Sequence, residues 1–222
     1  MASEIRFGNR KSRGYRRRKP LPALIVIGLL GLMAMVIWIR AIVTKSDIDE
    51  VIRCTPAATP PAGTTFTPLG HAALDDAAPI APDQVAVKVL NAGRIRGQAL
   101  ITTESLRQFG FSQVGQPDSD PAYPENDAKC WGQIRFGESG TSAARTLSLM
   151  VPCAELVKDN RPDASVDFAI GNRFADLTPT QQAREVLRQL TATSHPGGDD
   201  SSAVNSPVID HDLLAAARDV TC

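Results

Sequence analysis

The longest apolar run in the chain lies near its N-terminus and extends from Leu21 to Ile39 without a charged residue. A helix over these 19 residues, rising about 1.5 Å per residue, approaches the ~30 Å thickness of the bilayer hydrocarbon core. Trp38 and Arg40 suit the outer membrane interface, which tolerates an amphipathic ring and a long cationic side chain. The pattern predicts a transmembrane helix over residues 21–43.

Basic residues are concentrated directly before this run. Eight of them lie between Arg6 and Lys19, and Glu4 is the single acidic residue among the first 20. One apolar run predicts a single-pass cell-membrane protein. Because Lys and Arg are enriched on the cytoplasmic side of membrane helices, we expect residues 1–20 to form a cytoplasmic tail and the C-terminal part to be extracytoplasmic. A cleaved signal peptide is the alternative, but its apolar region is usually only about 7–15 residues long and ends in a small-x-small site, which is missing here.

The net charge of zero hides two oppositely charged regions. Residues 45–222 carry 15 basic and 23 acidic residues, so the basic excess is confined to the N-terminal tail. Anionic lipid headgroups attract such a tail, whereas an acidic domain is unsuited to binding a phosphate backbone. We therefore expect a membrane partner and no nucleic acid.

Residues 44–84 are rich in Pro, Ala and Thr, and six of their prolines lie between Pro56 and Pro82. A segment of this composition buries little apolar surface and stays extended. We predict a stalk that separates the membrane helix from a folded domain.

Regular periodicity begins at Val85. Residues 85–90 alternate as a strand does, and the turn Asn91-Ala-Gly93 follows. From Gly97 to Phe109 the apolar spacing is helical, and Gly110 occupies the usual position of a helix end. This stretch predicts a strand, a turn and a helix in that order.

The same alternation continues to about residue 192. The later predicted elements are a loop at 116–127, a strand at 130–136, a helix at 141–151, a strand at 166–170, and a helix capped by Thr178. Strands that alternate with helices predict a small two-layer α/β domain over residues 85–192 with a mostly parallel or mixed sheet. Residues 193–222 are predicted to be a flexible loop and a C-terminal amphipathic helix.

All four cysteines, Cys54, Cys130, Cys153 and Cys222, lie on the predicted outer side of the membrane, where disulfides persist. Four cysteines allow three pairings. Our hypothesis joins Cys130 to Cys153 across one strand-helix unit and Cys54 to Cys222 across the whole domain. Zinc is a weak alternative because no C-x-x-C pair is present, and we expect no metal and no cofactor.

Several residues of the first strand, turn and helix resemble the opening signature of the LytR C-terminal domain family. They are Val87, Val89, Leu90, Asn91, Gly93, Gly97, Leu106, Phe109, Gly110 and Phe111. Ile134 to Gly137 and Val166 to Gly171 follow in the family's order, so the resemblance covers residues ~85–175. Ala92 departs from it, since glycine is commoner there.

The whole arrangement resembles that of actinobacterial envelope integrity proteins. This resemblance implies a role in maintaining the cell envelope, without an assigned reaction. The related LytR-CpsA-Psr proteins carry a separate transferase domain for which this chain has no room. We therefore expect a protein that is not an enzyme.

One turn has the features of an anion site. Asn91, Gly93, Arg94, Arg96 and Gly97 lie between a strand and a helix N-terminus, where free amides and the helix dipole favour anions. A phosphate or uronate of a cell-wall polymer is the ligand that this chemistry suits. The other interpretation is that both glycines serve a tight turn and the arginines are solvated.

No catalytic motif is apparent elsewhere. His71, His195 and His211 lack metal-ligand spacing, and neither G-x-S-x-G nor H-E-x-x-H occurs. The carboxylates Asp118, Asp120, Asp199 and Asp200 are interpreted as solvated loop charges. The favoured function is a membrane-anchored module that binds a cell-wall polymer or an envelope protein, including another protein with a LytR C-terminal domain. An adaptor acting through membrane partners and an enzyme of wall polymer metabolism are the alternatives.

Overall fold

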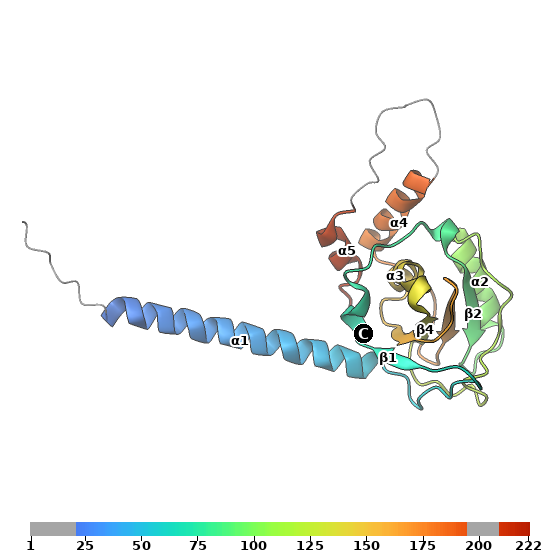
Figure 1. The fold of residues 1–222 in the computed structure, drawn as a ribbon, viewed down its shortest axis with the longest axis horizontal. Coiled ribbons are helices and arrows are strands. Elements are labelled where there is room, and N and C mark those ends of the chain that lie inside the picture. Colours follow the sequence, from blue (N-terminus) through green and yellow to red (C-terminus); the bar gives the residue numbers. More distant parts are fainter. Residues whose placement is uncertain (1–20, 195–208) are drawn as a thin grey trace, which may run out of the picture. The chain divides into compact units, whose positions relative to one another are not determined.

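The computed structural model describes residues 21–194 and 209–222. It divides into two compact units, Met1–Thr44 and Lys45–Cys222. Helix α1 (Leu21–Ile52) begins in the first unit and ends in the second (Figure 1). Between Ile25 and Ile39 its large apolar side chains are 50–71% exposed. Within the described residues, no helix meets both the length and the apolarity needed to cross a membrane. The predicted cytoplasmic tail lies outside the described residues.

A six-stranded mixed sheet forms the centre of the second unit. Its strands are β1 (Thr67–Leu69), β2 (Val87–Asn91), β3 (Asp118–Ser119), β4 (Gly132–Phe136), β5 (Glu155–Lys158) and β6 (Val166–Ile170), in the spatial order β1-β5-β4-β6-β2-β3. The pairs β2/β3, β2/β6 and β4/β5 are parallel, while β1/β5 and β4/β6 are antiparallel. The mixed α/β sheet expected from the sequence is confirmed.

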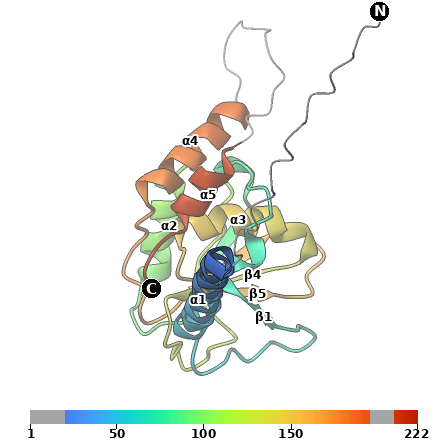
Figure 2. The ribbon, with the colours of Figure 1, turned by 90° about the vertical axis from the view of Figure 1, so that its left-hand side faces the viewer.

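Helices cover one face of this sheet. They are α2 (Gln98–Gln108), α3 (Thr141–Met150) and α4 (Gln181–Ser194), and α5 (His211–Ala217) packs on α3 and α4 (Figure 2). Alternate residues of the strands, such as Val89, Ile134 and Phe168, join Leu106 of α2 and Leu147 of α3 in the main hydrophobic core. Three short 3-10 turns, His71–Leu74, Pro82–Gln84 and Glu138–Gly140, complete the elements.

The opposite face of the sheet is covered by irregular chain instead of helices. Leu90 and Ala169 of the sheet pack there with Cys54, Tyr123 and Cys130 in a second cluster. Every buried core residue of the described chain lies between Ile52 and Ala217. The second unit therefore contains its complete core and can fold without the first.

The predicted stalk is part of this domain, so the stalk interpretation is corrected. β1 pairs with β5 along Thr67–Leu69, Leu74 is fully buried in the main core, and Cys54 is held in a disulfide. Prolines are tolerated at an edge strand and in irregular chain because no ladder hydrogen bond is needed from them. The few apolar residues of the segment find long-range partners that its composition does not reveal.

Local predictions differ from the structure at three further points. β5, only four residues long, was not predicted, and β3 lies inside the predicted loop. Helix α4 begins at Gln181, and its capping side chain is Thr180, whose hydroxyl accepts from the Ala183 N–H at 3.0 Å. Thr178 is therefore not the cap. Elements this short are fixed by their neighbours in the sheet more than by their own periodicity.

Two disulfides are present, but both predicted pairings were wrong. Cys54 bonds to Cys130 and Cys153 bonds to Cys222. Cys130 is buried in the cluster on the helix-free face of the sheet, where the chain after α1 also lies. Cys153 follows α3 on the side of the C-terminal segment. Cys130 and Cys153 each lie two residues before one of two neighbouring parallel strands, β4 and β5, but they bond to different segments of the chain.

Candidate functional site

The predicted anion turn connects β2 to α2, and its own side chains already use part of its hydrogen-bonding capacity. Asn91 accepts from the Gly93 N–H at 3.1 Å through Oδ1 and donates to the Ile95 carbonyl at 3.0 Å through Nδ2. The Arg94 N–H donates to Asn172 Oδ1 at 2.9 Å. Two backbone N–H groups that could donate to an anion are therefore already hydrogen-bonded within the protein.

The remaining residues of this turn are solvent-exposed or packed against backbone. Arg94 and Arg96 are exposed, and their guanidinium groups have no ion-pair or hydrogen-bond partner within residues 21–194 and 209–222. Gly97 adopts a left-handed φ of 78° before α2, and a Cβ on Gly93 would lie 3.3 Å from the Gly171 carbonyl carbon. Asn91 and Gly93 thus have structural roles, and ligand binding at Arg94 and Arg96 stays a prediction.

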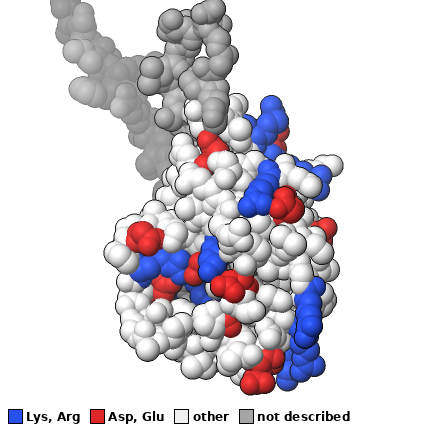
Figure 3. Space-filling model, turned by 90° about the vertical axis from the view of Figure 1, so that its right-hand side faces the viewer, with Lys and Arg blue, Asp and Glu red and all other residues white. Residues whose placement is uncertain are grey.

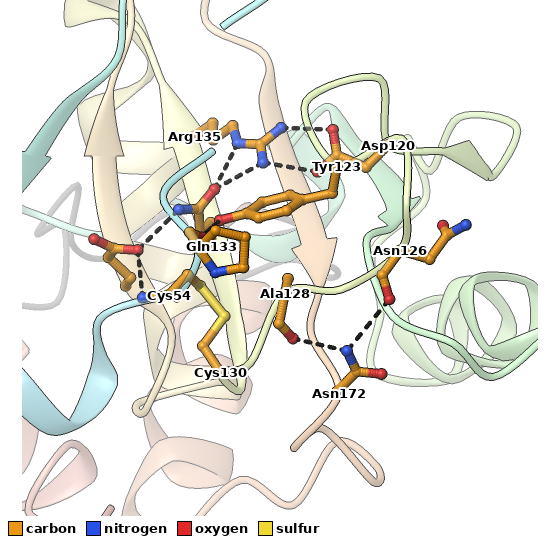
Figure 4. The surroundings of a disulfide bond; sticks show 11 residues. Cys54, Asp120, Tyr123, Asn126, Ala128, Cys130, Gln133, Arg135 and Asn172 are labelled. Atoms are coloured by element: carbon orange, nitrogen blue, oxygen red, sulfur yellow. Dashed lines mark hydrogen bonds and ion pairs between the residues drawn. A yellow bond between two sulfur atoms is a disulfide. The ribbon is translucent and has the colours of Figure 1, made fainter. Parts of the chain in front are cut away.

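A buried charged network lies on the helix-free face of the sheet, beside the Cys54–Cys130 disulfide (Figure 4). Arg135 of β4 makes a bidentate pair with Asp120, with N–O distances of 2.9 and 2.7 Å. Its remaining donors reach Gln133 Oε1 at 3.0 and 2.7 Å. The interpretation of Asp120 as a solvated loop carboxylate was therefore wrong.

This network extends to the segment that follows α1. The Gln133 amide donates to Glu155 Oε2 at 2.8 Å, and the same oxygen accepts from the Cys54 N–H at 3.0 Å. The Arg135 guanidinium stacks over the Phe66 ring at 4.8 Å. Burial raises the pKa of the Tyr123 hydroxyl, which donates to the Pro56 carbonyl at 3.1 Å. Nearly every polar group here has a partner, which is typical of a structural network.

A second charged cluster lies on the helical side, and its composition is different. Arg145 of α3 is 1% exposed and Arg218, just after α5, is 5% exposed. Both donate to the same oxygen, Asp75 Oδ1, at 3.2 and 3.0 Å respectively. The Asp75 side chain is 53% exposed. Two buried cations thus share one half-exposed carboxylate.

Many N–H groups of this pair have no acceptor. A guanidinium has five donors, and the described residues accept one bond from each of the two arginines. Nε of Arg145 and both Nε and Nη2 of Arg218 are buried without a partner. Burial, and then the charge of Arg145, lowers the pKa of Arg218 to about 10. Buried donors without acceptors are costly, so these N–H groups keep an unused capacity for hydrogen bonds.

These arginines line a cavity of about 590 Å³ together with His71, Asp75, His211 and Asp219. Nε2 of His71 donates to the Pro152 carbonyl at 3.0 Å, so this histidine is held in place and is not the solvated stalk residue predicted. Burial and the nearby Arg218 lower the pKa of His71. His211 is exposed, and His195 lies outside the described residues.

Sequence reasoning did not single out Arg145 or Arg218. Arg145 lies beside the apolar stripe expected for its helix, and an arginine in that position is ordinarily solvated. In the structure α3 is buried on nearly all sides, because the short turn His71–Leu74 and the helices α4 and α5 cover what would be its outer face. The run of small residues around Arg145, which lets neighbouring elements approach closely, was the available signal.

The sequence of the α/β domain described above is similar to known proteins. Residues 84–174 match the family model of the LytR cell envelope-related transcriptional attenuator. The chain is also 36% identical, over 86% of its own length and 90% of the relative's, to the cell envelope integrity protein Cei of Mycobacterium tuberculosis. The chain belongs to the Cei family. The family resemblance inferred from the sequence is thereby confirmed.

A solved structure is similar to this chain in both sequence and fold. The soluble domain of a conserved hypothetical secreted protein from Mycobacterium marinum matches with a TM-score of 0.60 and 33% identity, over 70% of this chain and 97% of that one. The LytR-type match includes Arg145, whereas Asp75 and Arg218 lie beyond its limits. The cavity is therefore built where the segments that flank the family domain pack onto it.

Proposed function

We propose that this protein is a non-enzymatic component of the cell envelope. It is anchored in the cell membrane by residues 21–43, with the N-terminus in the cytoplasm, and its domain outside the membrane binds an anionic envelope component. The likeness to a cell envelope integrity protein over most of the chain supports the setting. The cavity that contains Arg145 and Arg218 is the observation that carries the binding function.

Support for the anchor comes from α1 and from the residues before it. Apolar side chains surround this helix and are exposed on all sides from Ile25 to Ile39, which is unfavourable in water. The eight basic residues before it favour a cytoplasmic N-terminus. In membrane vesicles of known orientation, protease should remove the C-terminal domain only from its extracytoplasmic side. Cleavage from the cytoplasmic side would contradict the topology.

Support for anion binding comes from the arginine N–H donors that have no acceptor, since Asp75 and Asp219 in the cavity lining balance the charges of the two arginines. Guanidinium groups form bidentate hydrogen bonds with carboxylates and phosphates, and they stay charged at neutral pH. Here both arginine side chains line the cavity and are held by packing, so little side-chain ordering is needed when a ligand arrives. Arginines that do not exchange protons near neutrality suit recognition better than general acid-base catalysis.

The test is sedimentation of residues 45–222 with an isolated mycobacterial cell-envelope fraction at low and high salt. Saturable, salt-sensitive binding is expected for the unaltered domain. The Arg218→Met variant should lose most of it. The double variant Arg94→Ala/Arg96→Ala removes two exposed arginines and is the matched control. If only the control variant loses binding, the site is the Asn91–Gly97 turn. If neither variant loses binding, anion recognition by these arginines is excluded.

An adaptor role is the second candidate, and one observation favours it. Ile95, Leu100 and Ile101 are 57%, 56% and 65% exposed beside the two exposed arginines, around the start of α2. Basic and acidic side chains interleave on the face shown in Figure 3, with wide uncharged areas between them. Exposed apolar groups of this kind are common in protein interfaces. Loss of co-purifying envelope proteins in an Ile101→Asp variant, with envelope sedimentation unchanged, would favour the adaptor.

A further inference from the structure

We propose that the ligand of the Arg145–Arg218 cavity is an anionic amphiphile with a phosphate or carboxylate head and one aliphatic chain. This inference rests on the proposed anion binding and adds the chemical class of the ligand. It follows from the contrast between two adjoining cavities, which we together call the groove.

The cationic end of the groove binds the head. Arg145 and Arg218 approach it from α3 and from the segment after α5, and both are held by Asp75. Because Asp75 Oδ1 receives both bonds, the guanidiniums converge on one region. A head group with two or three oxygens could accept hydrogen bonds from these guanidiniums, whose unpartnered Nε and Nη2 atoms are buried and would have to turn toward the cavity.

The apolar end of the groove is a second cavity of about 360 Å³. It shares Asp75, His211 and Leu214 with the first cavity, so the two adjoin. The residues that belong to it alone are mainly aliphatic, including Pro79, Leu190 and Ile209. A ligand whose head lies at Arg218 can therefore extend past Leu214 over an apolar surface.

A hydrocarbon chain fits this second cavity better than a peptide does. A bound peptide needs partners for its backbone N–H and C=O groups, and each one left without a partner is costly. The lining offers the Thr193 hydroxyl and the His211 ring, while Asp75 and Asp76 would repel a terminal carboxylate. An aliphatic chain requires no hydrogen bonds and gains from leaving water.

The groove is pre-formed, because α5 is capped at its start and is attached to the domain by its buried side and by the chain that follows it. Asp210 caps its first turn by accepting from the Asp212 N–H at 2.9 Å, and the Cys153–Cys222 disulfide ties down the chain beyond it. Leu214 and Ala217 pack in the cluster that α5 shares with α3 and α4. The segment that carries His211, Leu214 and Arg218 is thus attached to the body of the domain independently of any ligand.

Titration calorimetry on residues 45–222 tests the proposal with four probes below their micellar concentrations. The probes are octyl phosphate, decyl phosphate, inorganic phosphate and dodecyl maltoside, which has a neutral head. Decyl phosphate should bind on the order of tenfold more tightly than octyl phosphate, because two more methylenes are buried. Inorganic phosphate should bind far more weakly, and dodecyl maltoside weakly or not at all.

Two variants assign the ends of the groove. Arg218→Met should weaken decyl phosphate binding roughly tenfold or more while leaving a chain-length dependence. Leu190→Gln should reduce the chain-length dependence while leaving inorganic phosphate binding unchanged. Arg94→Ala/Arg96→Ala should change neither the affinity for decyl phosphate nor the chain-length dependence. Decanoate in place of decyl phosphate distinguishes a carboxylate head from a phosphate head.

The outcomes separate this inference from the proposed function. Equal binding of octyl, decyl and inorganic phosphate would overturn the aliphatic part and leave anion binding intact. Equal binding of dodecyl maltoside and decyl phosphate would overturn the charged head. If no phosphate probe binds a domain that melts cooperatively, both the amphiphile and the proposed anion site are wrong. The chain-length series uses the unaltered protein, so it decides even if a variant fails to fold.

Discussion

The two buried arginine clusters of this domain lie on opposite sides of its sheet and are built differently. On the helix-free face, Arg135 faces Asp120 in a bidentate pair, and Gln133 and Glu155 use most of the remaining polar groups. On the helical side, Arg145 and Arg218 share a single oxygen of Asp75 and line open space. The first cluster is nearly complete, and the second is not.

This difference indicates separate roles for the two clusters. A complete buried network fixes the position of the chain segments that it joins, here the segment after α1 and the strands β4 and β5. The incomplete cluster joins the segment at Asp75 to α3 and to the chain after α5, but it leaves buried donors without acceptors and so costs stability. Such costs are typical of binding sites, where stability is given up for function. Substitutions in the two clusters should therefore have opposite signatures.

The largest effect is expected from Arg135→Ala, which leaves Asp120 buried without a cation. Removing one partner of a buried pair costs about 3–5 kcal/mol of the free energy of unfolding. Denaturant unfolding of residues 45–222 measures it. The double variant Asp120→Asn/Arg135→Met should be less damaging than Arg135→Ala, because no charge stays buried alone. Equal losses would show that the pair itself, and not the orphaned carboxylate, sets the cost.

Loss of either disulfide should cost about 2–5 kcal/mol, and the loops they close are of similar length, 76 and 69 residues in separation. The two serine double variants should differ in function. Without Cys153–Cys222 the chain after α5 is released, so decyl phosphate binding should weaken. Without Cys54–Cys130 it should persist in whatever fraction stays folded. A non-reducing peptide map that joined Cys54 to Cys222 would contradict the structure.

Arg218→Met is expected to leave stability unchanged or to raise it by about 1 kcal/mol. A buried cation with several unsatisfied donors is replaced by a side chain that packs without such cost. Binding should be lost in the same variant. Unfolding by denaturant and calorimetry on one sample measure both quantities. Destabilisation of the size expected for Arg135→Ala would mean that the second cluster is also structural.

The smallest effect concerns pH and His71. Burial and Arg218 lower its pKa in the folded domain below the ordinary value near 6.5, while Asp75 and Asp49 act in the opposite direction. The unfolded chain therefore binds the proton more readily, so stability is full above about pH 6.5 and declines as the pH falls below it. Melting temperature between pH 7.5 and 5 should fall less in His71→Gln. Identical profiles would remove His71 as a source of the dependence.

Much of the central sheet could be predicted from the sequence. The residues 85–90, 130–136 and 166–170 alternate strongly enough to give strands close to β2, β4 and β6, and the helical spacing of 97–109 and 141–151 gave α2 and α3. The candidate site was less predictable. The turn at Asn91 was located from local signals, whereas the cavity depends on Asp75, Arg145 and Arg218. Arg145 lies 70 residues after Asp75, and Arg218 lies 73 residues after Arg145.

Periodicity, the opening signature of the domain and the number of cysteines were determined by the sequence itself, because each depends on residues close together in the chain or on residue type alone. The disulfide partners, the packing of residues 54–84 onto the sheet, the burial of Asp120 and the pairing of Arg145 with Arg218 were decided only by tertiary structure. Each of these depends on which face of the sheet a segment covers. A segment rich in proline or a lone arginine carries no local sign of that choice, since the partners that bury it come from distant parts of the chain.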